Sequence, residues 1–159
     1  MTTLNEAKLL LEEHLDEGAI CPCCDRFAKR YERKLNSGIA KALIQIYKTH
    51  GPIAPTAEIP WVNVEKDLIQ GNPLHFARDF SIARFWKLLV PKITEEDGEK
   101  KRTSGIWRLT PLGVKFVEGR VRVKRSAHIY NDTLHDFSGT MVDIQGCLGD
   151  KFNYAELMT

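Results

Sequence analysis

The chain of 159 residues has the length of one ordinary domain, or of one domain with small appendages. Hydrophobic residues make up 43% and charged residues 28%, which excludes a wholly disordered chain. The net charge of +2 conceals two basic segments, because residues 21–48 carry seven basic and two acidic side chains and residues 100–125 carry nine and one. Each segment lies between acidic ones, and this asymmetry favours an anionic partner, either nucleic acid or an acidic protein.

Nothing in the sequence predicts a membrane protein or a secreted one. No apolar run approaches the ~20 residues of a membrane-spanning helix. The N-terminus is acidic and amphipathic, unlike a secretory signal. Three of the four cysteines lie within Cys21–Cys24, so they do not form the spaced framework of a disulfide-stabilised domain. We therefore expect a cytoplasmic protein with no membrane partner.

The first predicted elements are helical. Leucines at helical spacing predict an amphipathic helix over residues 4–17, ended by Gly18. Residues 25–34, after the cysteine cluster, have the pattern of a short basic helix. A longer helix is expected to run to residue 50, with Asn36 or Ser37 as its N-cap.

The middle of the chain predicts two more helices and then a hairpin. Residues 61–70 have a helical pattern, and after a tight turn residues 75–90 predict a third helix, which Pro91 would stop. Asp97-Gly98 is typical of a two-residue hairpin turn, and residues 106–109 read as the returning strand.

The C-terminal third predicts alternating strands and short helices. Thr110-Pro111 has the pattern of an N-cap followed by proline at the first helical position. Apolar and polar residues alternate over 121–129, which predicts a half-buried strand. Residues 141–144 fit either a short strand or a helix start, and residues 152–157 predict an ordered final turn of helix.

The order of elements over residues 37–118 resembles a winged helix-turn-helix domain. The segments that carry the resemblance are Phe85-Trp86-Lys87-Leu88-Leu89-Val90, the turn Asp97-Gly98, and Gly105-Ile106-Trp107-Arg108-Leu109-Thr110-Pro111-Leu112-Gly113. In bacterial winged-helix regulators a similar Leu-Thr-x-x-Gly step joins the second wing strand to a helix. The whole chain also resembles small uncharacterised bacterial and phage proteins that join such a domain to an N-terminal cysteine pair.

We therefore predict an α+β, mainly helical protein in three parts. Residues 1–35 would form an N-terminal helix and cysteine loop, residues 36–119 the winged helix-turn-helix domain, and residues 120–159 a C-terminal β/α extension.

The resemblance implies double-stranded DNA as the partner, read by the third helix. Ser81, Arg84 and Lys87 would face the major groove, with Arg78 near a phosphate. Two further basic groups would follow the DNA backbone: Lys100, Lys101 and Arg102 on the wing, and Arg120, Arg122 and Lys124 on the basic strand. The acidic wing turn, residues 95–99, would instead repel phosphate. The same polar positions also suit a solvated surface, and winged-helix folds also serve as protein-binding modules.

Cys21 and Cys24 have the Cys-x-x-Cys spacing of a zinc knuckle, so zinc is a candidate cofactor. A closed structural site needs four ligands. The remaining candidates are Cys23, Cys147, His14, His128 and His135, and two chains could instead share one ion, which would make a homodimer. Reduced thiols without a role, or a redox pair, are the alternatives that the spacing leaves open.

No common catalytic motif is present, and we expect no enzyme. His128 and His135, with Asp132 and Asp136 nearby, leave a small metal-dependent enzyme as a minor third hypothesis. The leading prediction is a DNA-binding transcriptional regulator or phage accessory factor. The alternative is an interaction module that binds and modulates a host protein.

Overall fold

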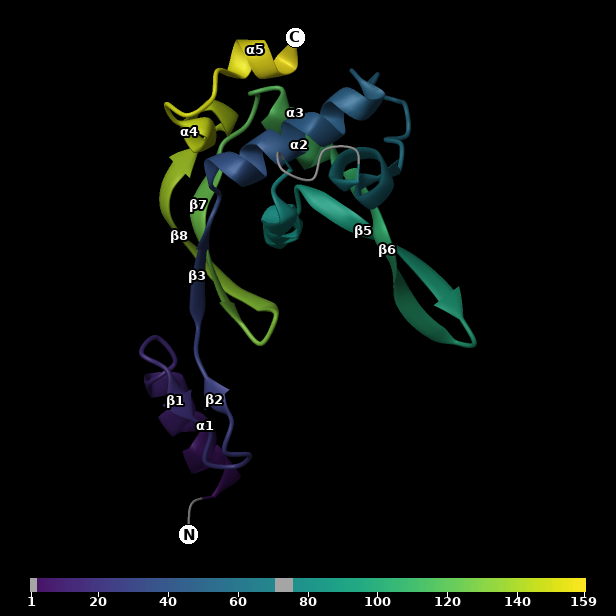
Figure 1. The fold of residues 1–159 in the computed structure, drawn as a ribbon. Coiled ribbons are helices and arrows are strands. Elements are labelled where there is room, and N and C mark those ends of the chain that lie inside the picture. Colours follow the sequence, from purple (N-terminus) through teal and green to yellow (C-terminus); the bar gives the residue numbers. More distant parts are fainter. Residues whose placement is uncertain (1–2, 71–75) are drawn as a thin grey trace. The chain divides into compact units, whose positions relative to one another are not determined.

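The computed structural model describes residues 3–70 and 76–159, without the side chains of residues 96 and 101–104. The fold is mixed α+β, with three small antiparallel sheets of strand order β1-β2, β3-β7-β8 and β4-β6-β5 (Figure 1). The chain divides into two compact units. The first unit is Met1–Lys34 with Ser126–Gly139, and the second is Leu35–Arg125 with Thr140–Thr159.

The first unit begins with helix α1, Leu4–Glu13. Thr3 and Glu6 form a capping box at its N-terminus. The sequence predicts this helix to residue 17, but it ends at Glu13, and Leu15 beyond it is buried. Strands β1 (Ala19–Ile20) and β2 (Phe27–Ala28) then form a short hairpin around the cysteine loop.

The basic helix predicted over residues 25–34 is wrong, because this segment is extended. Strand β3, Tyr31–Lys34, pairs antiparallel with Ser126–Ile129 of β7 (Val123–Tyr130), and β8 (Thr133–Val142) lies on the other side of β7. A distant strand thus satisfies the backbone groups of β3, and this non-local pairing overrides the local helical pattern.

Helix α2, Ser37–His50, forms much of the core of the second unit, and its prediction is confirmed. The Asn36 side chain accepts a hydrogen bond from the Ile39 amide at 2.8 Å, and Gly51, at φ +74°, follows the last turn. Seven side chains of this helix are buried: Ile39, Ala40, Ala42, Leu43, Ile44, Ile46 and Tyr47.

The two helices predicted between residues 61 and 90 are both shorter than expected. Residues 61–70 contain strand β4, Val62–Asn63, and one π-helical turn, η1, Glu65–Ile69. The third helix is the 3₁₀ helix η2, Arg78–Trp86, and His75, where the prediction begins it, lies outside the described residues.

Leu88–Val90 do not belong to that helix, and Pro91 does not stop it. Lys87 has a left-handed backbone (φ +58°) and ends η2, and strand β5, Leu89–Glu96, begins two residues later. Pro91 lies within β5, which is an edge strand of its sheet. An edge strand tolerates proline because one side of its backbone needs no partner.

The predicted hairpin is confirmed, and its second strand is longer than expected. Asp97 and Gly98 both have positive φ, 52° and 79°, as a two-residue turn of this kind requires. The returning strand β6 covers Glu99–Leu109 and pairs with β5 on one side and β4 on the other.

Helix α3, Pro111–Val117, begins where Thr110-Pro111 predicts. The Thr110 side chain accepts from the Gly113 amide at 3.0 Å, and its hydroxyl donates to the carbonyl of Lys87. The Thr110 amide donates to the carbonyl of Leu88 at 3.1 Å. The start of α3 is thereby bonded to the end of η2.

The C-terminal residues complete the second unit. Strand β8 ends at Val142 and helix α4, Ile144–Leu148, follows after one residue, so the segment predicted as either strand or helix start contains both. Helix α5, Tyr154–Met158, confirms the ordered end. Among the described residues, no helix is both long and apolar enough to cross a membrane.

We expect Gly113→Ala to lower the free energy of unfolding by about 2 kcal/mol or more. A Cβ atom at this position would lie 1.9 Å from the carbonyl oxygen of Leu88, so backbone would have to move. Gly146→Ala is the matched control, since Gly146 also bonds an N-cap side chain but its nearest neighbour would be 3.4 Å away. The free energy of unfolding of this control, measured by urea denaturation, should be unchanged or higher by up to about 1 kcal/mol. Equal stability of the two variants would contradict the role given to Gly113.

Candidate nucleic-acid interface and cysteine loop

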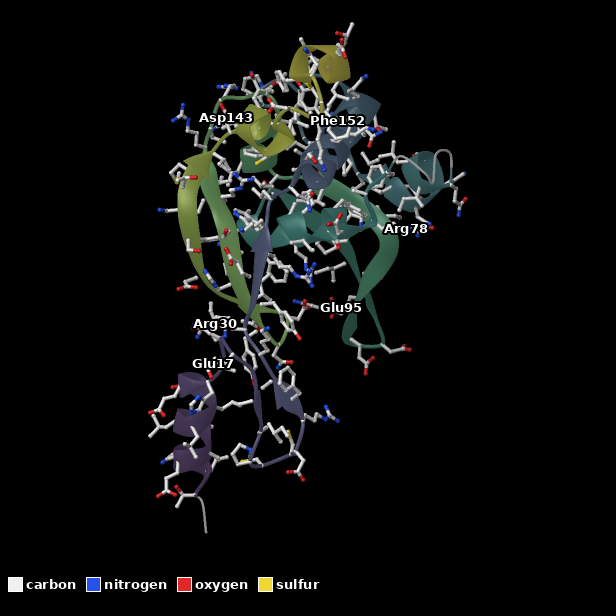
Figure 2. The ribbon with its side chains drawn as sticks, turned by 60° about the vertical axis from the view of Figure 1, so that its left-hand side comes forward. Glu17, Arg30, Arg78, Glu95, Asp143 and Phe152 are labelled. Atoms are coloured by element: carbon white, nitrogen blue, oxygen red, sulfur yellow. The ribbon has the colours of Figure 1, made fainter. Side chains whose placement is uncertain are left out.

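The type of helix formed by η2 gathers the predicted contact residues into one row. A 3₁₀ helix has three residues per turn, so positions i and i+3 lie above one another. Arg78, Ser81 and Arg84 therefore share one row, and Lys87 follows at the same spacing just after the helix. Arg78 and Lys87 are exposed and the other two half-exposed (Arg78 is labelled in Figure 2).

A second row of η2 anchors it. Phe80, Ala83 and Trp86, also three residues apart, are all buried. Phe80 packs edge-on against Phe76 and against Trp107 of β6, with ring centroids 5.3 and 5.4 Å apart. The helix is thus attached to its sheet by the row that carries no charge.

Local contacts hold the guanidinium group of Arg84 against its own helix. Its Nη1 donates to the carbonyl of Ser81 at 2.9 Å, and its Cζ lies 4.3 Å from the centroid of the Phe85 ring. Stacking of this kind limits the rotamers of a long side chain, which reduces the entropy it would lose on binding a phosphate or a base.

In the β5–β6 hairpin, the backbone register places one pair of opposite charges and one pair of like charges, Glu96 and Glu99, across from one another. Glu95 of β5 lies opposite Lys100 of β6, at the position labelled Glu95 in Figure 2. Lys101 and Arg102 lie opposite Thr94 and Ile93 in the backbone register. The side chains of these two predicted residues are outside the described part of the structure. Directly opposed residues of opposite charge attract one another, so Lys100 offsets part of the acidic turn.

The strand predicted over residues 121–129 is confirmed as β7, although it begins two residues later than expected. Strand β7 begins at Val123, so Arg120 and Arg122 precede it and Lys124 lies within it, all three with exposed side chains. Arg120 forms an exposed ion pair with Glu118 at 3.3 Å.

One contact that the sequence did not reveal brings this basic segment to η2. The indole Nε1 of Trp86 donates to the backbone carbonyl of Lys124 at 2.6 Å. The end of the third helix and the start of β7 are therefore neighbours, although 38 residues separate them. Lys124 of the basic segment therefore lies beside the end of η2.

In the first unit, the cysteine loop forms a tight turn that backbone hydrogen bonds close. The Cys21 amide donates to the carbonyl of Arg26 at 2.8 Å, and the Asp25 amide donates to the carbonyl of Cys21 at 2.9 Å. Asp25 has a left-handed backbone, with φ +58°. The amides of Cys23 and Cys24 hydrogen-bond to the Cys21 sulfur and lower the pKa of that thiol.

Of the other predicted metal ligands, His135 lines a cavity of the first unit together with Cys21 and Cys23, whereas His14, His128 and Cys147 have contacts elsewhere. His14 lies 4.0 Å from Glu17, His128 Nε2 lies 2.6 Å from the hydroxyl of Ser138, and His135 packs edge-on against Tyr130. Cys147 is buried, and burial raises its pKa to about 11. Over the described residues, no three His, Cys, Asp or Glu side chains gather closely enough to hold a metal ion, including His128 and His135 with the aspartates.

Comparison with known protein families, with curated proteins and with solved structures found no match to this chain. Its function is therefore inferred from its own residues.

We expect Cys147 to resist alkylation in the folded protein. In metal-free protein at pH 8, iodoacetamide should modify it at least about a hundredfold more slowly than the exposed Cys23, because a pKa near 11 leaves very little thiolate. Peptide mass spectrometry would measure both rates, and the two should converge in denaturant. Equal rates in the folded protein would contradict the burial of this thiol.

Proposed function

We propose that this chain is a DNA-binding winged-helix protein, a transcriptional regulator or phage accessory factor whose partner is double-stranded DNA. The observation that carries the proposal is the row of Arg78, Ser81 and Arg84 on η2, with Lys87 directly after the helix. These residues are exposed or half-exposed, while the adjacent row of the same helix is buried in the core.

The topology of the second unit supports this assignment. Helix α2, strand β4, the turn η1, helix η2 and the β5–β6 hairpin follow one another, and β6 lies between β4 and β5. This order is compatible with a winged helix-turn-helix core in which η2 is the recognition helix and the β5–β6 hairpin is the wing.

The chemistry of each side chain decides whether we assign it to a base contact or to a phosphate contact. Arg84 and Ser81 would contact base edges in the major groove, because arginine can donate two parallel hydrogen bonds to guanine. Lys87 would face the major groove beside them. The other basic residues would make the phosphate contacts that supply affinity and fix orientation: Arg78, Lys100, Lys101, Arg102, Arg120, Arg122 and Lys124.

We expect binding to labelled random duplex DNA to weaken steeply with salt. Six or more phosphate contacts cost roughly a thousandfold in affinity between about 50 and 200 mM salt. The double variant Arg84→Gln with Lys87→Gln should bind at least about tenfold more weakly, because a cation at a base or phosphate contributes ~1 kcal/mol or more to binding. Fluorescence anisotropy measures both effects, and glutamine retains much of the length of the side chains.

The control for this variant is Lys48→Gln with Lys151→Gln, which removes the same charge from exposed residues of α2 and of the segment between α4 and α5. It should bind nearly as the parent protein does. If both double variants lose affinity equally, then only net charge matters and the assignment of η2 as recognition helix is wrong.

A second prediction concerns the basic segment before β7. The pair Arg120→Gln with Arg122→Gln should lower the slope of log affinity against log salt by about 2, and it should do so equally on every DNA sequence. Contacts to phosphate carry no sequence information, so a change confined to one sequence would place these residues at the bases instead.

If the protein does not bind DNA even at low salt, the result would favour the alternative, an interaction module that binds a host protein. Such a module should pass through heparin without retention and should recover one partner from host lysate in stoichiometric amount.

A further inference from the structure

The cysteine loop of the first unit has half of the donors that a structural zinc site requires. Cys21 and Cys24 are three residues apart in a hairpin turn, and zinc in structural sites takes four ligands in a tetrahedron. Cys21 is half-exposed and Cys24 exposed. Within the described ranges, 3–70 and 76–159, no third donor lies close enough to complete a site.

We propose that Cys21 and Cys24 bind a zinc ion together with the same two cysteines of a second copy of this chain, so that one ion joins a homodimer. The site would have four thiolates, two from each chain. Each thiol loses its proton to solvent as its sulfur–zinc bond forms, and zinc undergoes no change of oxidation state. The inference stands apart from DNA binding, because none of its residues belongs to the proposed DNA surface.

The backbone of the loop is already arranged for this role. The bonds from Cys21 to Arg26 and from Asp25 to Cys21, with the left-handed backbone of Asp25, close the turn. The loop therefore has a defined conformation without a second thiol pair.

Charge around the loop favours a second pair of thiolates. Four thiolates around Zn²⁺ leave a net charge of about −2. Arg26 and Lys29 line the same cavity as Cys21 and Cys24. Two copies bring four such cations to one site, and these would offset the excess negative charge.

An apolar pair beside the loop provides the protein surface that a dimer would cover. Ile20 of β1 and Phe27 of β2 face one another across the hairpin, directly next to Cys21 and Arg26. They are 66% and 63% exposed, although both are large and hydrophobic. A two-fold axis through a shared zinc ion would bring both copies of this pair close to it, where each side chain could be buried.

The test uses the full chain, purified, saturated with zinc and then freed of excess. Metal analysis should give one zinc per two chains, and light scattering after gel filtration should give the mass of a dimer. Removal of zinc with EDTA should give monomers, and adding zinc again should restore the dimer. Cobalt(II) in place of zinc should show the visible absorption of a tetrahedral thiolate site.

Two variants locate the ligands. Cys24→Ser should lose both the metal and the dimer, whereas Cys23→Ser, altered at a neighbouring exposed thiol, should retain both. Circular dichroism with thermal unfolding identifies a variant that has failed to fold, and the EDTA cycle on the parent chain tests the proposal independently of any variant.

A third variant tests the apolar surface. Ile20→Ser should leave the cobalt absorption in the dimer unchanged and raise the dimer dissociation constant by roughly tenfold or more, because each copy loses a buried aliphatic side chain.

Other results would overturn the proposal. One zinc ion in a monomer would mean that a single chain completes the site, and a dimer that survives EDTA would mean that zinc does not join the chains. A chain that retains no metal after removal of excess zinc, or retains it equally in Cys24→Ser, would remove the assignment of these cysteines.

Discussion

The second unit depends on how the end of η2 is joined to the start of α3. Lys87 takes a left-handed backbone, and the carbonyls of Lys87 and Leu88 accept hydrogen bonds from the hydroxyl and the amide of Thr110. Gly113 fits one turn further on, where a Cβ atom would strike the Leu88 carbonyl. These contacts set where the third helix stops and where β5 begins, and they give the Thr-x-x-Gly step a steric reason.

Because η2 stops at Trp86, the residues proposed to contact DNA occupy a short and closely tethered element. Its buried row packs on α2 and on the sheet, and the indole of Trp86 reaches the backbone of Lys124. The basic segment before and within β7 thus meets the end of η2 through one hydrogen bond, although the two are far apart in the sequence. An anionic polymer would respond to the local density of positive charge on such a surface more than to the net charge of +2 of the whole chain.

Elements with strong local signals were predictable, and elements made by distant pairing were not. Asn36 caps the helix over 37–50 as expected, and Asp97-Gly98 forms the turn, because both depend on a few neighbouring residues. The patterns at 25–34 and 88–90 predict helices, yet Tyr31–Lys34 pairs with β7. The left-handed Lys87 ends η2 before Leu88, and Leu89 and Val90 pair with β6. A short stretch of sequence shows neither which distant strand will pair with it nor which distant group will hydrogen-bond to its carbonyls.

The same division holds for the candidate sites. The order of residues alone establishes the three-residue spacing of Arg78, Ser81 and Arg84, the charge of the basic segments and the Cys-x-x-Cys pair. Folding of the whole chain makes η2 a 3₁₀ helix, which aligns that spacing in one row, and places the described histidines and Cys147 in contacts of their own. The reason is physical: local spacing follows from covalent order, whereas the neighbours of a side chain are set by which distant segments bury their apolar surface together.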